Sequence, residues 1–461
     1  MSSELGKYKP YPEYKESGVE WLDLLPSDWK TNALKFALSI PMTDGPHETP
    51  TFTDEGIPFV SAEAVSSGTI NFDKIRGYIS EEDNRRFSLK YKPKLHDVYM
   101  IKSGATTGVS AIVETDIKFN IWSPLAVMRV NADFSPYYLL SYLRSNTFQE
   151  QVQLNWSFGT QQNIGMGTLE NIGICCPPIE EQQSIASFLD YETARIDSLI
   201  AKQQQLIELL KEKRQAVISH VVTKGLNPDV PMKDSGVEWL GQVPEHWDVK
   251  PLRYLGSCQN GINISADAFG TGYPFVSYGD VYNNRELPTK PKGLVESSIS
   301  DRVSYSVKSG DVLFTRTSET IEEIGFTSVC IHEIKDACFA GFIIRFRPSK
   351  ETLYPYFSKY YFSNNLLRYF FVKEMNLVTR ASLSQDLLKK LTVAIPPYDE
   401  QVEIADYLNL KNQFFDIAEQ SCCKQINLLK ERRISLISSA VTGKIDLRNW
   451  APPLTPSDEV A

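Results

Sequence analysis

The sequence lacks the long apolar runs that membrane spans and signal peptides require. Among its 461 residues, no stretch approaches the roughly 18 consecutive apolar residues of a membrane span. The opening segment, MSSELGKYKPYPEYKES, contains no apolar core. We therefore expect a cytoplasmic protein that does not associate with a membrane.

Paired cysteines and familiar catalytic motifs are also missing. The seven cysteines fit neither a disulfide framework nor a zinc spacing, so we expect them to be reduced. The sequence contains no GxxxxGK[ST] phosphate loop and no HExxH metal motif, and its five histidines are scattered. We expect no metal site, no cofactor and no catalytic residues.

Composition limits the class of protein. With 42% hydrophobic, 11% aromatic and 23% charged residues, the chain has the composition of a globular protein. Its length exceeds what one hydrophobic core usually supports, so two or more domains are expected. The net charge of -9 argues against a nucleic-acid partner, because phosphates are bound by Lys and Arg. Only locally clustered cations would permit such a partner.

The sequence contains an internal duplication. SGVEWL occurs twice, within the segments 14–30 and 232–248, which align without a gap. The ends of the two copies also agree, since PPIEEQQSIASFLD at 177–190 aligns with PPYDEQVEIADYLN at 396–409. Between these ends the match is weaker. The pattern indicates a common scaffold that carries two specialised middles.

Each copy ends in a segment with helical periodicity. No Pro or Gly occurs between Ile179 and Lys224, which predicts one helix of roughly 45 residues, about 70 Å long at 1.5 Å per residue. Apolar residues recur at steps of three, four and seven, and we expect the two helices to pack on each other. The alternative is two independent core helices. The candidate residues of the seam between these helices are Ile185, Leu189, Leu199, Leu206, Leu210, Ile404, Leu408, Phe415, Leu429 and Leu436.

The middle of each copy predicts a mixed α/β domain. Strand-like runs such as IPFVSA, DVYMIK and DVLFTR are bounded by Gly, Pro, Asn and Asp. Helical stretches begin at Pro136 and Pro355. The predicted boundaries are 1–176 for the first domain, 177–226 for the first long helix, 227–395 for the second domain, 396–445 for the second long helix and 446–461 for a tail.

Polar loops after matched strands are the candidate binding sites. The segments 101–108 and 315–325 carry a cation and several hydroxyls, which suit phosphate and base-edge contacts. The basic clusters at 84–94 and 287–293 could contact phosphates. The alternatives are a solvated hairpin for the loops and a solvated face for the basic clusters. The candidate nucleic-acid contacts are Arg85, Arg86, Lys102, Ser103, Thr106, Thr107, Gln161, Gln162, Asn163, Lys290, Lys292, Arg316, Thr317, Ser318 and Arg380.

Together these motifs resemble the specificity subunit of a type I restriction-modification enzyme. The resemblance rests on the duplicated SGVEWL opening, the G.PFVS and GDV strands, and PP..EQ..IA..L leading into a helix with LLKE[KR]R, and it covers nearly the whole chain. It implies an α+β fold in which two mixed α/β target-recognition domains, in an inverted pseudo-two-fold arrangement, are separated by two long antiparallel helices. Each domain would read one half of a bipartite, asymmetric DNA site.

The resemblance also implies partners. Two modification subunits, which are adenine methyltransferases, would dock on the helical regions, and restriction subunits with translocase and nuclease activity would join them on double-stranded DNA. The chain itself would carry no cofactor and no active site, because methylation of the flipped adenine takes place in the partner. Half-sites about one helical turn apart, roughly 34 Å, would face the same side of the duplex.

Two alternatives remain open. A self-contained DNA methyltransferase would need a glycine-rich donor site and a motif whose first residue binds the target amine, and Ile395 in IPPY cannot do so. A helical adaptor that assembles proteins without reading DNA is the second alternative.

Overall fold

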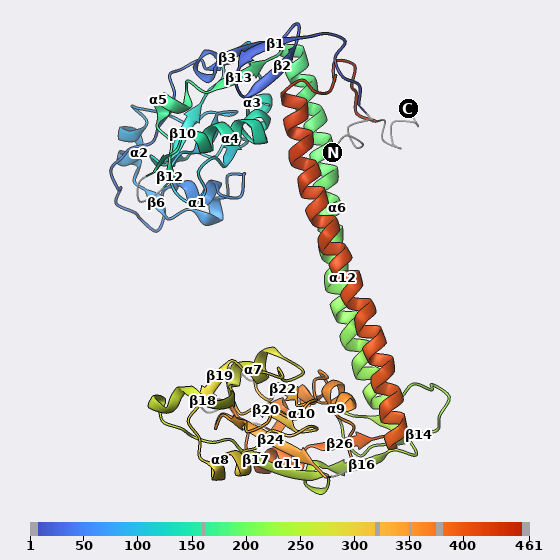
Figure 1. Cartoon of the computed structure of the whole chain (residues 1–461). Helices are drawn as coiled ribbons and strands as arrows, with labels where there is room; N and C mark the ends of the chain where they lie inside the picture. Colours follow the sequence, from blue (N-terminus) through green and yellow to red (C-terminus); the bar gives the residue numbers. More distant parts are fainter. Residues whose placement is uncertain (1–7, 159–161, 319–322, 350–351, 375–380, 454–461) are drawn as a thin grey trace. The chain divides into compact units, whose positions relative to one another are not determined.

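The computed structural model describes residues 8–158, 162–318, 323–349, 352–374 and 381–453. Each copy of the repeat ends in a long helix, which is α6 (Ile179–Lys224) in the first copy and α12 (Tyr398–Val441) in the second (Figure 1). The chain divides into two compact units, each of which contains one end of both helices. Unit 1 consists of Met1–Gln203 with Lys424–Ala461, and unit 2 of Gln204–Cys423.

Unit 1 is built around a four-stranded antiparallel sheet in the order β4-β10-β7-β8. A three-stranded sheet, β6-β5-β9, contains the parallel pair β5–β9. The strands are β1 (Tyr14–Val19), β2 (Leu22–Pro26), β3 (Lys30–Ala33), β4 (Thr43–Asp44), β5 (Ile57–Val60), β6 (Tyr78–Ile79), β7 (Val98–Ile101), β8 (Ser110–Ile112), β9 (Asn120–Ile121), β10 (Leu125–Met128), β11 (Ser157–Phe158), β12 (Gln162–Asn163) and β13 (Gly173–Cys176). The shorter helices are α1 (Ala62–Val65), α2 (Glu81–Phe87), α3 (Pro136–Leu143), α4 (Asn146–Leu154) and α5 (Met166–Leu169).

Unit 2 repeats this topology. Its four-stranded sheet has the order β17-β24-β20-β22, and its three-stranded sheet β19-β18-β23 contains the parallel pair β18–β23. The strands are β14 (Met232–Asp234), β15 (Gln242–Pro244), β16 (Asp248–Pro251), β17 (Gly256–Asn260), β18 (Phe269–Val276), β19 (Gly293–Val295), β20 (Val312–Thr315), β21 (Thr317–Ser318), β22 (Thr327–Val329), β23 (Cys338–Phe339), β24 (Ile343–Pro348), β25 (Ala381–Ser382) and β26 (Thr392–Ile395). The shorter helices are α7 (Tyr278–Asn283), α8 (Ile299–Ser304), α9 (Pro355–Tyr361), α10 (Leu367–Glu374) and α11 (Gln385–Lys390).

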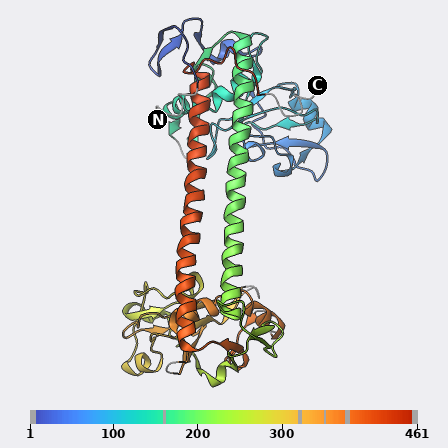
Figure 2. The ribbon, with the colours of Figure 1, turned by 90° about the vertical axis from the view of Figure 1, so that its right-hand side faces the viewer.

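The long helices pack against each other within each unit (Figure 2). In unit 1, Ile185 and Ile196 of α6 share a buried cluster with Leu436 of α12. In unit 2, Val222 near the end of α6 shares a cluster with Ile404 near the start of α12. Since the start of one helix meets the end of the other, the helices are antiparallel in both units. The mixed α/β fold and the packing of the two long helices are therefore confirmed.

The core of each unit contains residues that occupy aligned positions in the two copies. Trp29 of unit 1 and Trp247 of unit 2 occupy aligned positions and are completely buried. In unit 1, the aromatic helix α3 buries Tyr138 and Tyr142 among side chains of the four-stranded sheet and of α6. The globular part of unit 1 is thus anchored on the start of α6.

The end of each long helix lies against the opening motif of the other copy. Gly443, at the end of α12, packs in unit 1 on the Pro26 and Trp29 of the first copy. Gly225, at the end of α6, packs in unit 2 on the Trp247 of the second copy. Each opening motif therefore contacts the helix end that belongs to the other copy.

Candidate nucleic-acid interface

Two polar segments selected from the sequence meet in unit 1. The loop after β7 lies along β12, because Ser103 forms a β-bridge with Asn163. The backbone N–H of Gly104 donates to the Gln162 carbonyl at 3.0 Å, and the N–H of Ile164 donates to the Lys102 carbonyl at 2.9 Å. Hydroxyl and amide side chains that lie about 60 residues apart in the sequence are thereby brought to one place.

The equivalent segments meet in unit 2 with the same pairing. Thr317 of β21 pairs with Ser382 of β25, and the N–H of Leu383 donates to the Arg316 carbonyl at 2.8 Å. Tyr278 also donates a hydrogen bond to the Thr317 carbonyl at 2.9 Å. The structure thus supports this polar surface on a common backbone frame in both units.

Lys102 of unit 1 is held by a buried carboxylate. Its Nζ lies 3.2 Å from an oxygen of Asp44, whose side chain is 1% exposed, and Lys90 also forms an ion pair with Asp44. Burial alone would raise the pKa of Asp44, but the hydrogen bonds from Lys90 and Lys102 hold that pKa below its usual value. Asp44 was not found from the sequence, because its segment shows no repeat signal.

Arg316, the counterpart of Lys102, has a different environment. Asp44 pairs with Ala126 of β10, and the matching position in unit 2, opposite Ile344 of β24, is Asn260. The Nε of Arg316 is buried without a hydrogen-bond partner in the described part of the chain. The carboxylate that pairs with Lys102 in unit 1 is thus replaced by an amide at the matching strand position of unit 2.

The remaining candidates fall into three groups. Arg86 forms ion pairs with Glu48 at 2.6 Å and Asp83 at 2.7 Å, and the Thr107 hydroxyl donates to the Gly104 carbonyl. Of the other candidates, Arg85, Thr106, Gln162, Lys290 and Lys292 are solvent-exposed, as are Arg86 and Asn163. Gln161 and Arg380 lie outside the described residues, and the side chain of Ser318 is likewise not described.

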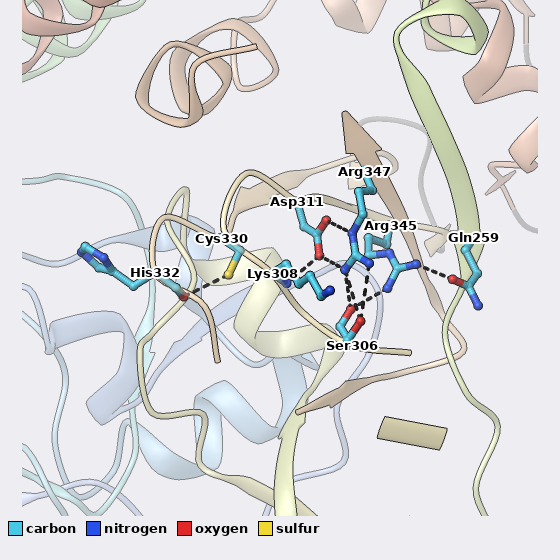
Figure 3. Close-up of polar contacts among 8 residues, drawn as sticks. All are labelled: Gln259, Ser306, Lys308, Asp311, Cys330, His332, Arg345 and Arg347. Carbon is cyan, nitrogen blue, oxygen red and sulfur yellow. Dashed lines mark hydrogen bonds and ion pairs between the residues drawn. The ribbon is translucent and has the colours of Figure 1, made fainter. Parts of the chain in front are cut away.

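A buried aspartate of unit 2 lies directly before β20, the strand that leads into β21. Asp311, from the GDV motif before β20, is fully buried and accepts hydrogen bonds from Arg347 at 2.7 and 2.6 Å and from the Lys308 N–H at 2.7 Å (Figure 3). The hydrogen bond with Asp311 raises the pKa of Arg347. Beside this pair, Arg345 donates hydrogen bonds to the Ser306 carbonyl and to the side chain of Gln259 (Figure 3).

Unit 1 contains the same ion pair. Asp97 accepts hydrogen bonds from Arg129 at 2.6 and 2.7 Å and from the Lys94 N–H at 2.8 Å. The two aspartates lie in the repeated HDV and GDV segments and could therefore be found from the sequence. Their arginine partners were not selected from the sequence. The pair ties the strand before each loop to the neighbouring strand of the sheet.

The EQ pair of the PP..EQ motif attaches the long helix to the opening motif. Glu181 accepts a hydrogen bond from the Trp29 indole at 3.0 Å and another from the Tyr11 hydroxyl, and Glu400 accepts one from the Trp247 indole at 3.1 Å. Gln182 and Gln401, which follow these glutamates, also occupy matching positions. The side chain of Gln182 accepts from the Ser135 N–H at the start of α3 at 2.8 Å.

The predicted helix seam is only partly buried. Ile185, Leu189, Ile404, Leu408, Phe415 and Leu436 are buried. Leu210 and Leu429 are half-buried, whereas Leu199 and Leu206 are 44% and 42% exposed and lie off the seam. Polar pairs occupy part of the interface between the helices: Arg214 binds Asp416 at 2.6 Å, and the aligned Arg433 binds Asp197 at 3.4 Å.

A sequence model of the family described as "Type I restriction modification DNA specificity domain" matches residues 26–209 and 244–421. The two matches cover more than half of the chain and fall on the two copies. The chain belongs to this family. The resemblance predicted from the motifs is therefore confirmed.

Several members of known name or structure are similar to this chain. The specificity subunit of the type I restriction enzyme EcoKI of Escherichia coli (strain K12) is 23% identical over 402 residues, which is 85% of this chain and 83% of that protein. The StySPI specificity subunit of Salmonella potsdam is 20% identical over 395 residues, again 85% and 83% of the two chains.

Two solved structures have a similar fold. The HsdS subunit from Thermoanaerobacter tengcongensis has a TM-score of 0.55 and 17% identity over 91% of this chain and 98% of its own. A chain from a structure on complex assembly and conformational transition of the type I R-M system has a TM-score of 0.66 and 16% identity, over 91% and 99%. Among the described residues of the present chain, no helix is both long and apolar enough to cross a membrane.

Proposed function

We propose that the chain is the non-catalytic specificity subunit of a cytoplasmic type I restriction-modification complex, and that it recognises DNA for partner subunits that methylate adenine or cut. The observation that carries the proposal is the repeated pairing of two polar segments, Ser103 with Asn163 and Thr317 with Ser382, in a chain of this family. A duplicated frame with unlike side chains suits a DNA site whose two halves differ in sequence.

Each recognition surface has residues suited to base edges and residues suited to phosphates. The exposed amides of Gln162 and Asn163 can pair with an adenine edge, and Arg316 with a guanine edge. Arg85 and the pair Lys290 and Lys292 are exposed cations suited to phosphates. The proposed recognition domains comprise residues 1–176 and 227–395, and 446–461 form a tail.

The long helices provide the proposed spacer and docking surface. Residues 177–226 and 396–445 would keep the two domains in an inverted arrangement, so that they read half-sites about 34 Å apart. Exposed leucines on α6, such as Leu199 and Leu206, are available for two modification subunits. Restriction subunits would join this assembly.

The test is co-expression with a modification subunit, followed by sequencing of methylated adenines in the host DNA. We expect a bipartite motif. Exchange of residues 30–175 for those of a relative should change only one half of the motif, and exchange of 250–395 only the other half.

The control is the modification subunit expressed alone. Adenine methylation that persists without this chain would contradict the proposal and favour an adaptor that does not read DNA. A change in both halves of the motif after exchange of one domain would contradict the assignment of one reader to each half-site.

A further inference from the structure

The short helix α7 of unit 2 carries two tyrosines whose hydroxyls bind the loop 315–325. The helix contacts β20 and β22, the two strands on either side of this loop (Figure 1). Tyr278 and Tyr282 are four residues apart, which places them on the same face of a helix. Their rings are stacked, with centroids 5.9 Å apart and an angle of 21° between the planes. The two side chains therefore form one aromatic surface beside the loop.

Each tyrosine hydroxyl holds one end of the loop. Tyr278 donates a hydrogen bond to the Thr317 carbonyl at 2.9 Å, and Tyr282 donates one to the Glu323 carboxylate at 3.0 Å. These two contacts lie on either side of residues 319–322, which are outside the described residues. The helix thus contacts the loop both where the chain leaves β20 and where it returns to β22.

The helix that carries the tyrosines is itself fixed. A capping box closes its start, because the Ser277 N–H donates to the Asp280 carboxylate at 2.8 Å and the Asp280 N–H donates to the Ser277 hydroxyl at 3.3 Å. Val281 is 1% exposed and packs in a core cluster with Leu313 of β20. The loop is therefore tied to a support that belongs to the core of unit 2.

Both hydroxyls are hydrogen-bond donors at neutral pH. Burial raises the pKa of Tyr278 above its usual value of about 10. The hydrogen bond to Glu323 raises the pKa of Tyr282. Phenylalanine at these positions would keep the rings and remove only the two donors.

The aligned helix of unit 1, α1, carries smaller side chains. Tyr278 aligns with Ala62, which has no polar group in its side chain, and Tyr282 aligns with Ser66. The Ser66 hydroxyl donates to the Glu63 carbonyl of α1 itself at 2.7 Å. Ala62 and Ser66 thus do not reproduce the two contacts.

The loops of the two units also differ in length. In each unit the N–H of the last loop residue, Gly108 or Gly325, donates to the carbonyl of the first, at 2.8 and 3.1 Å. Between these equivalent ends the loop has eight residues in unit 1 (101–108) and eleven in unit 2 (315–325). A turn closes the shorter loop, because the Thr107 hydroxyl donates to the carbonyl three residues earlier at 2.7 Å. The longer loop loses more conformational entropy when it is held in one shape, so it needs further contacts.

We propose that Tyr278 and Tyr282 are positioning residues for DNA recognition, whose hydroxyls hold the loop 315–325 in the shape that reads the second half-site. The inference rests on the proposed function and adds a requirement that unit 1 does not have. A loop that is ordered before DNA arrives loses less entropy on binding. The affinity for the recognised sequence therefore depends on the two hydroxyls, whereas the general attraction of cations to phosphates does not.

The experiment uses the chain assembled with its modification subunit. We expect Tyr278→Phe with Tyr282→Phe to weaken binding of a duplex that carries the methylated motif about tenfold, the effect of two neutral hydrogen bonds. Affinity for DNA without the motif, and the slope of log K against log salt, should not change, because no phosphate contact is removed. Sequencing of methylated adenines should show relaxed preference only in the half of the motif that exchange of 250–395 alters.

The matched control is Tyr254→Phe with Tyr305→Phe, which removes two hydroxyls of unit 2 outside α7 and the loop and should leave affinity and motif unchanged. Wild-type affinity and motif in the double variant of α7 would overturn the proposal, whether or not its unfolding temperature falls. Equal relaxation of both halves of the motif would also overturn it, because unit 1 has no tyrosine at either aligned position. A wild-type complex that does not distinguish its own motif from other DNA would instead refute the proposed function.

Discussion

Units 1 and 2 make the same contacts where the opening motif meets the long helix, and different contacts on their polar surfaces. The indole of Trp29 binds Glu181 as that of Trp247 binds Glu400, and both glutamates begin a long helix. At the surface, by contrast, Lys102 faces the carboxylate of Asp44, whereas the matching strand position in unit 2 is Asn260. The matched contacts belong to the frame that both units share, whereas the unmatched contacts differ from one unit to the other.

The largest expected effect concerns a matched contact. Asp97→Asn and Asp311→Asn should each lower the free energy of unfolding by about 3 kcal/mol, because each leaves a partly buried arginine without its carboxylate. Urea unfolding followed by circular dichroism measures the loss. Glu63→Gln and Asp248→Asn remove exposed ion pairs and should cost less than about 1 kcal/mol. Clearly unequal losses for the two buried aspartates would break the equivalence of the units.

The two helix-end glycines provide a sharper comparison. Both Gly225 and Gly443 have positive φ, so alanine should cost about 1 kcal/mol at either position from backbone strain. At Gly443 the added Cβ would also lie 2.4 Å from Pro26, whereas at Gly225 the nearest atom is a Glu400 oxygen at 3.1 Å. Gly443→Ala should therefore lower the thermal unfolding midpoint more than Gly225→Ala. Equal shifts would mean that unit 1 relaxes around the new methyl group.

Lys102 and Arg316 are aligned, but we expect their replacement to have different effects. Lys102→Ala should cost about 1–2 kcal/mol of stability, because the buried Asp44 loses one of its partners. Arg316→Ala should leave stability nearly unchanged and weaken binding of the recognised DNA about tenfold, the value of a base contact. Unfolding curves and DNA titrations of both variants test this. An equal loss of DNA affinity would show that Lys102 and Arg316 have the same role.

Much of the frame could be predicted from the sequence because duplication and periodicity are regular signals. The absence of Pro and Gly predicted a helix over 179–224, and α6 spans these residues. Periodicity was less informative about the seam. Leu199 and Leu206 follow the expected spacing, but they face solvent, since the helix carries apolar residues on more than one face.

The exchange of helix ends could not be predicted. Gly225 and Gly443 end helices of similar sequence, so either end could pack on either opening motif, and only the fold decides between them. The site, too, could be predicted only in part. The two loops stood out because they follow matched strands, whereas Asp44 depends on three-dimensional neighbours that have no local pattern.

The smallest expected effect is a pH dependence of unit 1. Burial raises the pKa of Glu181 above its usual range, although hydrogen bonds from Tyr11 and Trp29 oppose the shift. The folded state then holds a proton that the unfolded state has released, in the window between the usual carboxyl pKa, about 4.3, and the raised value. Stability should fall as pH rises through this window and then become constant.

Glu181→Gln should remove this dependence, because an amide does not titrate. The difference in unfolding free energy between wild type and variant, measured in steps from pH 4 to pH 7, should change in favour of the variant as pH rises. The aligned Glu400→Gln serves as the comparison for unit 2. A difference that changes in favour of wild type would mean that the hydrogen bonds to Glu181 outweigh its burial, and that the carboxylate is held ionised at the start of α6.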